Sequence, residues 1–102
     1  MTTNTKAVQL GQVVCTMSIN ELIAHDSSFS KFITRSLHRH KQCDWGDLCN
    51  EDKASNDLAL KDQGRLFSSY NIPGGIMTDQ KKVWIITEWN REVTTILFPS
   101  EY

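Results

Sequence analysis

The chain has 102 residues, of which 39% are hydrophobic and 23% are charged, with a formal net charge of -1. This length suits one domain, and the composition is ordinary for a soluble globular protein. A net charge this close to zero supplies no field that would attract nucleic acid or an anionic membrane. No apolar run approaches the roughly 20 residues of a membrane span, and no signal-peptide stretch opens the chain. We therefore expect one cytoplasmic domain over 1–102, with residues 1–7 disordered.

Cysteine usage is typical of a reducing compartment, because Cys15, Cys43 and Cys49 cannot all pair within one chain. Thiols of this kind are usually small buried apolar groups. The segment from His38 through His40 and Cys43 to Cys49 places four soft donors close together, but the last gap exceeds the roughly two to four residues usual within a zinc ligand pair. We predict no metal and no cofactor.

The N-terminal part of the chain predicts a strand followed by a short helix. Residues 8–16 contain β-branched residues and are expected to be extended, with Gly11 at a bulge or turn. Ser18 and Glu21 fit a capping box, in which each side chain bonds the backbone of the other. The helix that they open is predicted to end near 25–28, where serines can cap the next helix.

A second helix has the clearest pattern of the chain. Its predicted buried face follows the helical repeat and comprises Phe29, Phe32, Ile33, Ser36, Leu37 and His40. This face is expected to pack in the core.

A third helix is predicted from Asp44, as its N-cap, to about Gln63, with Gly64 as a left-handed stop. On this helix Asp52 and Asn56 lie on the same side as its apolar residues. Buried polar groups must find partners or cost a few kcal/mol, so we expect both side chains to point inward into hydrogen bonds.

The C-terminal part predicts strands. Residues 65–72 form the first and end at the 73–75 turn; 83–88 and 93–98 form a hairpin, with Asn90 in a left-handed position.

The strand over 83–88 is apolar on both faces, since Val83 and Ile85 alternate with Trp84 and Ile86, so it is central or covered twice. The predicted fold is α+β, with an N-terminal extended segment and about three helices packed on one face of a C-terminal antiparallel sheet of three to four strands.

The chain resembles a family of small bacterial proteins found mainly on plasmids and other mobile elements. The resemblance lies in His40 with Asp44-Trp45-Gly46-Asp47-Leu48, in Val83-Trp84-Ile85-Ile86-Thr87-Glu88, and in Arg91, Thr94-Thr95-Ile96-Leu97, Pro99 and Glu101-Tyr102. This chain departs from the family pattern at Cys43, where glycine is usual, and at Trp89-Asn90, where Ala-Asp is usual. The family has no established activity, so the resemblance implies a mobile-element origin and no particular chemistry.

Several polar residues could face the junction between helices and sheet. They are His40, Asp52, Asn56, Arg65, Ser68, Tyr70, Glu88 and Arg91. One hypothesis is a metal-independent ribonuclease-like toxin, in which His40 and Glu88 act as acid and base while Arg65 or Arg91 holds the phosphate. Ser68 or Tyr70 would orient that phosphate. The net charge argues against it, because no basic surface would attract RNA.

The same residues can instead form a buried polar network, which is the interpretation of them that we favour. In that interpretation Asp52 pairs with Arg65 or Arg91, and Asn56 bonds a strand backbone.

A different hypothesis is a non-enzymatic interaction module that binds a protein partner or itself. It rests on Trp89, which is placed at the hairpin tip, exposed as an interface anchor or folded back on the sheet. We favour this module and do not expect nucleic acid as a partner.

Overall fold

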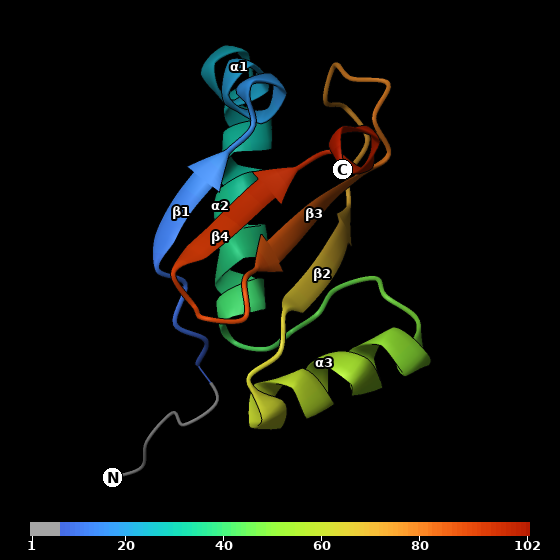
Figure 1. Ribbon diagram of the computed structural model, residues 1–102. Helices are drawn as coiled ribbons and strands as arrows, with labels where there is room; N and C mark the ends of the chain where they lie inside the picture. Colours follow the sequence, from blue (N-terminus) through green and yellow to red (C-terminus); the bar gives the residue numbers. More distant parts are fainter. Residues whose placement is uncertain (1–6) are drawn as a thin grey trace, which may run out of the picture.

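The chain folds into three α-helices and one four-stranded sheet, and the computed structural model describes residues 7–102 (Figure 1). In chain order the elements are β1 Gln12–Cys15, α1 Met17–His25, α2 Ser27–Lys41, α3 Asn50–Asp62, β2 Leu66–Asn71, β3 Lys82–Thr87, β4 Val93–Leu97 and the 3-10 turn η1 Pro99–Glu101. This confirms the predicted α+β class. The disorder expected for 1–7 falls, apart from Ala7, outside the described residues.

The sheet has the order β1-β4-β3-β2, and it is mixed where we predicted an antiparallel one. β2, β3 and β4 form the expected antiparallel ribbon. β1 lies parallel to β4, because α1 and α2 carry the chain away from β1 before it returns. Gly11, with φ at 64°, turns the chain into β1 where a Cβ would lie 2.3 Å from the Glu92 carbonyl oxygen. The prediction of a turn point at this glycine is confirmed.

Helices α1 and α2 cover one face of the sheet, and Figure 1 shows α2 running behind the strands. Five of the six residues predicted for the inner face of α2 are buried, and Leu37 is half-buried. Of these, Phe29, Phe32 and Ile33 form the main core together with strand residues such as Tyr70 and Val83. The opposite face, called here the outer face, has no helix across it within residues 7–102.

Two helix caps differ from prediction. Thr16, and not Ser18, caps α1, because its hydroxyl accepts from the Ile19 amide at 3.4 Å. Asp26 caps α2 in place of a serine, since its carboxylate accepts from the Phe29 amide at 3.0 Å. A carboxylate in this position also interacts favourably with the helix dipole.

The third helix begins at Asn50, so the prediction that Asp44 caps it is wrong. Residues 44–48 instead run along β2, where Gly46 forms a parallel bridge to Ser69. The Asp47 amide donates to the Ser69 carbonyl at 2.7 Å, and Gly46 has φ at 77°. Pairing with a strand edge therefore replaces helix in this segment, and α3 lies at one end of the sheet beside β2 (Figure 1).

Two left-handed positions lie one residue away from where we predicted them. Gln63, and not Gly64, takes the left-handed conformation at the end of α3, with φ at 59°. In the β3–β4 turn Arg91, and not Asn90, has a positive φ of 61°. None of the helices formed within residues 7–102 is long and apolar enough to span a bilayer.

Candidate functional site

His40 lies at the centre of a closed polar network and not in an open site. The side chain is fully buried at the end of α2. Its Nδ1 is 2.6 Å from the Ser68 hydroxyl of β2, and its Nε2 is 2.9 Å from the Thr87 hydroxyl of β3. The Thr87 hydroxyl lies 2.7 Å from that of Thr94 in β4, which donates to the Leu10 carbonyl at 2.7 Å. The chain of bonds thus ties α2 to three strands and to the lead-in of β1.

These bonds assign the neutral tautomer of His40. Because Thr94 donates to Leu10, the Thr87 hydroxyl must donate to Thr94 and can only accept from His40. The ring therefore carries its proton on Nε2, and Nδ1 accepts from Ser68. Burial, and then the positive charge of Arg91, lower the pKa of His40 from 6.5 to about 4. At neutral pH this histidine is an uncharged structural group.

Arg91 ties the β3–β4 turn to the end of α3. Its guanidinium donates to the carbonyls of Gly64 at 2.6 Å, Glu88 at 3.1 Å and Ala59 at 3.4 Å. Burial lowers the pKa of this group. A cation at the carbonyl end of a helix is favourable, so Arg91 has a structural role and is not presented to a phosphate.

Asn56 and Asp52 do not point the same way. Asn56 is buried, and its amide bonds both backbone groups of Phe67, donating at 2.5 Å and accepting at 3.0 Å. This confirms the predicted bond to a strand. Asp52 is exposed in the first turn of α3, where the helix dipole favours a carboxylate, so its predicted burial and arginine pairing are wrong.

The remaining candidates are also divided between the two faces. Arg65 pairs with Glu88 at 3.5 Å, and both side chains are partly exposed. Tyr70 is buried on the helix side and donates to the Asp44 carbonyl at 2.7 Å, and burial raises the pKa of its hydroxyl. Glu88 follows inward-facing Thr87 and so points away from His40. The structure does not bring His40 and Glu88, the two proposed acid–base residues, together. It therefore shows no open site of the kind that the ribonuclease hypothesis requires.

The outer face carries an aromatic groove, and Arg65 is the only one of the polar candidates that lines it. It has a volume of about 270 Å³ and is lined by Arg65, Phe67, Trp84, Ile86 and Tyr102.

The rings of this groove form an edge-to-face series. Phe67 and Trp84 lie 5.0 Å apart between centroids, and Trp84 and Tyr102 lie 5.8 Å apart. The Arg65 guanidinium lies 5.4 Å from the centre of the Tyr102 ring and donates to its hydroxyl at 2.7 Å. The groove is thus an apolar surface with one cation at its rim.

Trp89 lies in the β3–β4 turn, directly after Glu88. Its side chain is 61% exposed, so it is not folded back on the sheet. Its carbonyl accepts from the Gln63 side chain at 3.2 Å, which holds the turn against the end of α3. An exposed indole on an anchored turn is a surface that can contact a partner without reordering.

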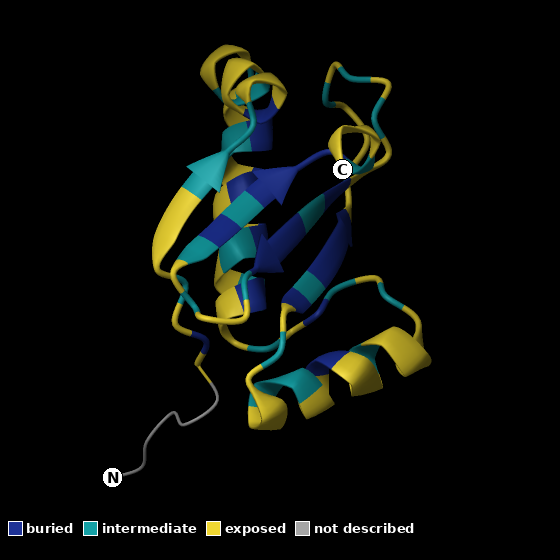
Figure 2. Ribbon diagram, in the orientation of Figure 1, coloured by how far each residue is buried: buried dark blue, intermediate teal, exposed yellow. Residues whose placement is uncertain are grey.

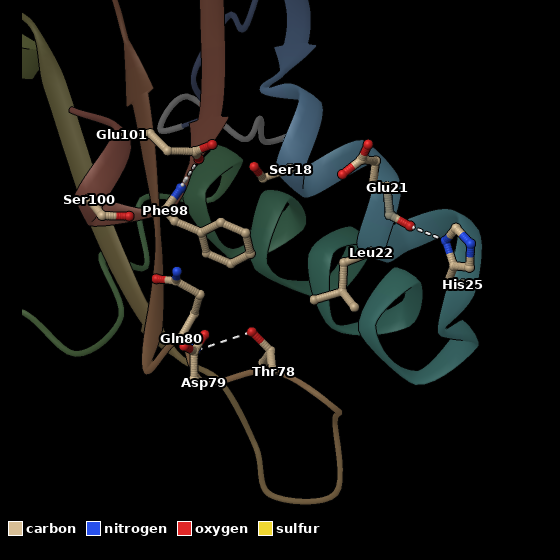
Figure 3. A pocket seen from close by; sticks show the side chains of 10 residues that line it. All are labelled: Ser18, Glu21, Leu22, His25, Thr78, Asp79, Gln80, Phe98, Ser100 and Glu101. Atoms are coloured by element: carbon tan, nitrogen blue, oxygen red, sulfur yellow. Dashed lines mark hydrogen bonds between the residues drawn. The ribbon is translucent and has the colours of Figure 1, made fainter.

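A larger hollow of about 570 Å³ lies between α1, the loop before β3 and η1 (Figure 3). Leu22 and Phe98 project into it, with carboxylates around them. The Glu101 carboxylate already accepts from the Phe98 amide and the Thr16 hydroxyl, each at 2.8 Å. The His25 ring is bonded to the Glu21 carbonyl at 2.7 Å. Two of its polar groups thus serve local structure, and this hollow is not our candidate site.

Within residues 7–102 no group of three or more histidine, cysteine or acidic side chains is arranged to hold a metal. The possible zinc segment is divided, because both nitrogens of His40 bond hydroxyls and Cys49 is exposed. Comparison of the chain with family models, curated proteins and solved structures found no match.

The sequence pattern indicated only some of the residues that line the groove. The apolar residues at both 84 and 86 indicated a second apolar face on β3. Phe67 of β2 lies on that same face, and Arg65 directly precedes β2. Tyr102 carried no signal, because it follows η1 and reaches the outer face only through the turn at Pro99.

Proposed function

We propose that this chain is a protein-interaction module, and that its contact surface is the aromatic groove together with Trp89. The observation that carries the proposal is the apolar groove on the outer face of the sheet. Figure 2 shows that no helix of residues 7–102 crosses this face. Aromatic and arginine side chains are the residue types that contribute most to protein interfaces.

The size of the groove favours a side chain of another protein over a small-molecule substrate. Binding sites for drug-sized ligands usually occupy about 300–1,000 Å³ and enclose the ligand. The present groove is smaller, at about 270 Å³, and lies on the open face of a sheet. One or two apolar side chains of a partner would fill it.

The charged residue at the rim of the groove, Arg65, indicates which group of the partner would lie next to its apolar side chains. The Arg65 and Glu88 side chains, which pair with each other, are 46% and 39% exposed. The Arg65 guanidinium is therefore also hydrated. A partner carboxylate could bind this guanidinium in place of water, with the tyrosine ring of Tyr102 beside it. We therefore infer a partner segment that presents an aliphatic or aromatic side chain next to an acidic residue, with Trp89 as a second contact.

Site-specific cross-linking in cells tests this proposal. A photoreactive phenylalanine analogue replaces Tyr102 at the groove, or Met77, which is 88% exposed in the loop before β3, as a control. We expect a heteromeric product from position 102 and none from position 77. The partner would then be purified and titrated against Trp84→Thr and Trp89→Ala, each expected to weaken binding at least about tenfold.

Leu58→Ala is the matched control for Trp89→Ala, because Leu58 is 59% exposed on α3. Circular dichroism establishes that every variant is folded. Equal cross-linking at both positions, or equal affinity of all variants, would contradict the proposal. A product of twice the chain mass would show that the groove binds a second copy instead.

A further inference from the structure

The two edge strands of the sheet, β2 and β1, differ in whether their outward backbone groups have hydrogen-bond partners. On β2 the outward N–H groups all have acceptors: Phe67 donates to the Asn56 side chain at 3.0 Å, Ser69 to the Trp45 carbonyl at 3.3 Å and Asn71 to the Asp47 carboxylate at 2.9 Å. A covered edge of this kind cannot add another strand.

On β1 the corresponding groups are open. The Gln12 amide donates to the Glu92 carbonyl, directly before β4, at 2.9 Å, and the Thr16 amide donates to the Ile96 carbonyl of β4 at 3.1 Å. The backbone groups of even-numbered residues therefore face β4. By alternation Val13 and Cys15 direct their N–H and C=O groups outward. No group within residues 7–102 bonds them, and Val13 is 39% exposed.

The sequence of β1 lacks the usual protection of an open edge. Natural edges are commonly blocked by lysine, proline, a bulge or an inward-pointing charge. Residues 12–16 read Gln-Val-Val-Cys-Thr and contain no charge and no proline. The net charge of -1 adds little repulsion between copies.

We propose that β1 pairs with β1 of a second copy, antiparallel, with Val14 opposite Val14 of the other copy. In this register Val13 and Cys15 of each copy face Cys15 and Val13 of the other, so all four outward N–H groups find carbonyl partners. Moving the register by two residues in either direction places Gly11 or Met17, which lie outside β1, in the pairing. Only the register centred on Val14 uses the strand completely.

The side-chain pairs of this register are compatible. On the outer face Val14 meets Val14, and β-branched residues in a non-hydrogen-bonded pair attract each other. On the helix side Val13 meets Cys15, and on the outer face, on either side of the Val14 pair, Gln12 meets Thr16. No like charges are brought opposite each other within the strand.

The resulting dimer is a continuous eight-stranded sheet. Its twofold axis is perpendicular to the sheet, so both aromatic grooves lie on the same face. A four-residue edge buries little surface, and interfaces of that size are weak. We expect a dissociation constant of about 10–100 μM. This inference does not depend on the proposed partner of the groove.

Disulfide formation tests the register. In a background carrying Cys15→Ser and Cys49→Ser, Val14→Cys would place two thiols on residues whose Cα atoms are about 4.5 Å apart, within the range of a disulfide. Val13→Cys is the matched control, because its two Cα atoms would be more than about 7 Å apart. Under mild oxidation at about 100 μM we expect a covalent dimer from Val14→Cys at least about tenfold faster than from Val13→Cys.

Charge exchange tests the same pair without a cross-link. Val14→Glu and Val14→Lys each place like charges opposite one another, so each variant alone should sediment as a monomer at about 100 μM. Mixed in equal amounts, they should form a heterodimer. Circular dichroism verifies that both are folded.

Three results would overturn the inference. The first is a wild-type chain that stays monomeric at about 1 mM. The second is equal cross-linking at positions 13 and 14. The third is self-association that neither charge at position 14 affects, since the interface would then lie elsewhere.

Discussion

Acid should destabilise this protein through His40 before most carboxylates are protonated. The ring is neutral in the fold, with a pKa lowered from 6.5 to about 4 by burial and by Arg91. Between these two values the unfolded chain binds a proton that the folded chain does not. Stability is therefore fully present above about pH 6.5 and is lost as the pH falls toward 4.

The magnitude follows from the size of the shift. One pKa unit corresponds to 1.36 kcal/mol, so the whole shift is worth about 3 kcal/mol, of which about 2 kcal/mol is already lost at pH 5. This is a large part of the roughly 5–15 kcal/mol by which a domain is stable. The physical cause is the loss of hydration that a charged ring would suffer in this buried position, together with its repulsion from the Arg91 guanidinium.

Urea unfolding at a series of pH values between 7 and 4.5 measures the effect. Tryptophan fluorescence is a suitable signal, because the buried Trp45 ring lies 5.6 Å from that of His40. His40→Gln is the matched variant, since its amide can bond both hydroxyls and does not titrate. It should be less stable at pH 7 but lose far less stability on acidification.

Two results would refute the reasoning. One is a wild-type chain and a His40→Gln variant that lose stability in parallel between pH 7 and pH 5. The other is a His40 ring that titrates near 6.5 in the folded protein by NMR.

Three further predictions concern stability, each measured by urea unfolding at pH 7. Asn56→Leu should cost about 2–3 kcal/mol, because both backbone groups of Phe67 lose their partner; a loss under about 0.5 kcal/mol would show that water replaces the amide. Gly11→Ala should lower the free energy of unfolding by at least about 2 kcal/mol, because φ is positive there and a Cβ would meet the Glu92 carbonyl. Gly64→Ala should lower it by less than about 1 kcal/mol, because the φ of Gly64 is not positive and the atom nearest to a Cβ is 3.0 Å away. Equal losses in the two variants would contradict the strain argument. Asp26→Ala should cost about 1 kcal/mol through the lost cap of α2, and Asp26→Ser should restore most of it.

The sequence by itself determined the elements whose signal is local. The stripe from Phe29 to His40 specified α2 and its buried face, because a helix places residues three and four apart on one side. The alternation over 83–88 likewise specified a central strand with two apolar faces. Both patterns are complete within one element, so no knowledge of its neighbours is required.

The tertiary structure alone decided features that depend on distant partners. Asp44-Trp45-Gly46-Asp47 has the local signature of a helix start, yet hydrogen bonds to Ser69 favour an extended path along β2. The hydroxyls that hold His40 come from residues 28 and 47 positions away in the chain. Local propensity amounts to less than about 1 kcal/mol per residue, and a few long-range backbone bonds in a buried environment exceed it. For that reason the polar residues that looked like one site in the sequence are divided in the structure: His40, Asn56, Ser68, Tyr70 and Arg91 support the fold, Arg65 and Glu88 lie at the surface, and Asp52 is exposed.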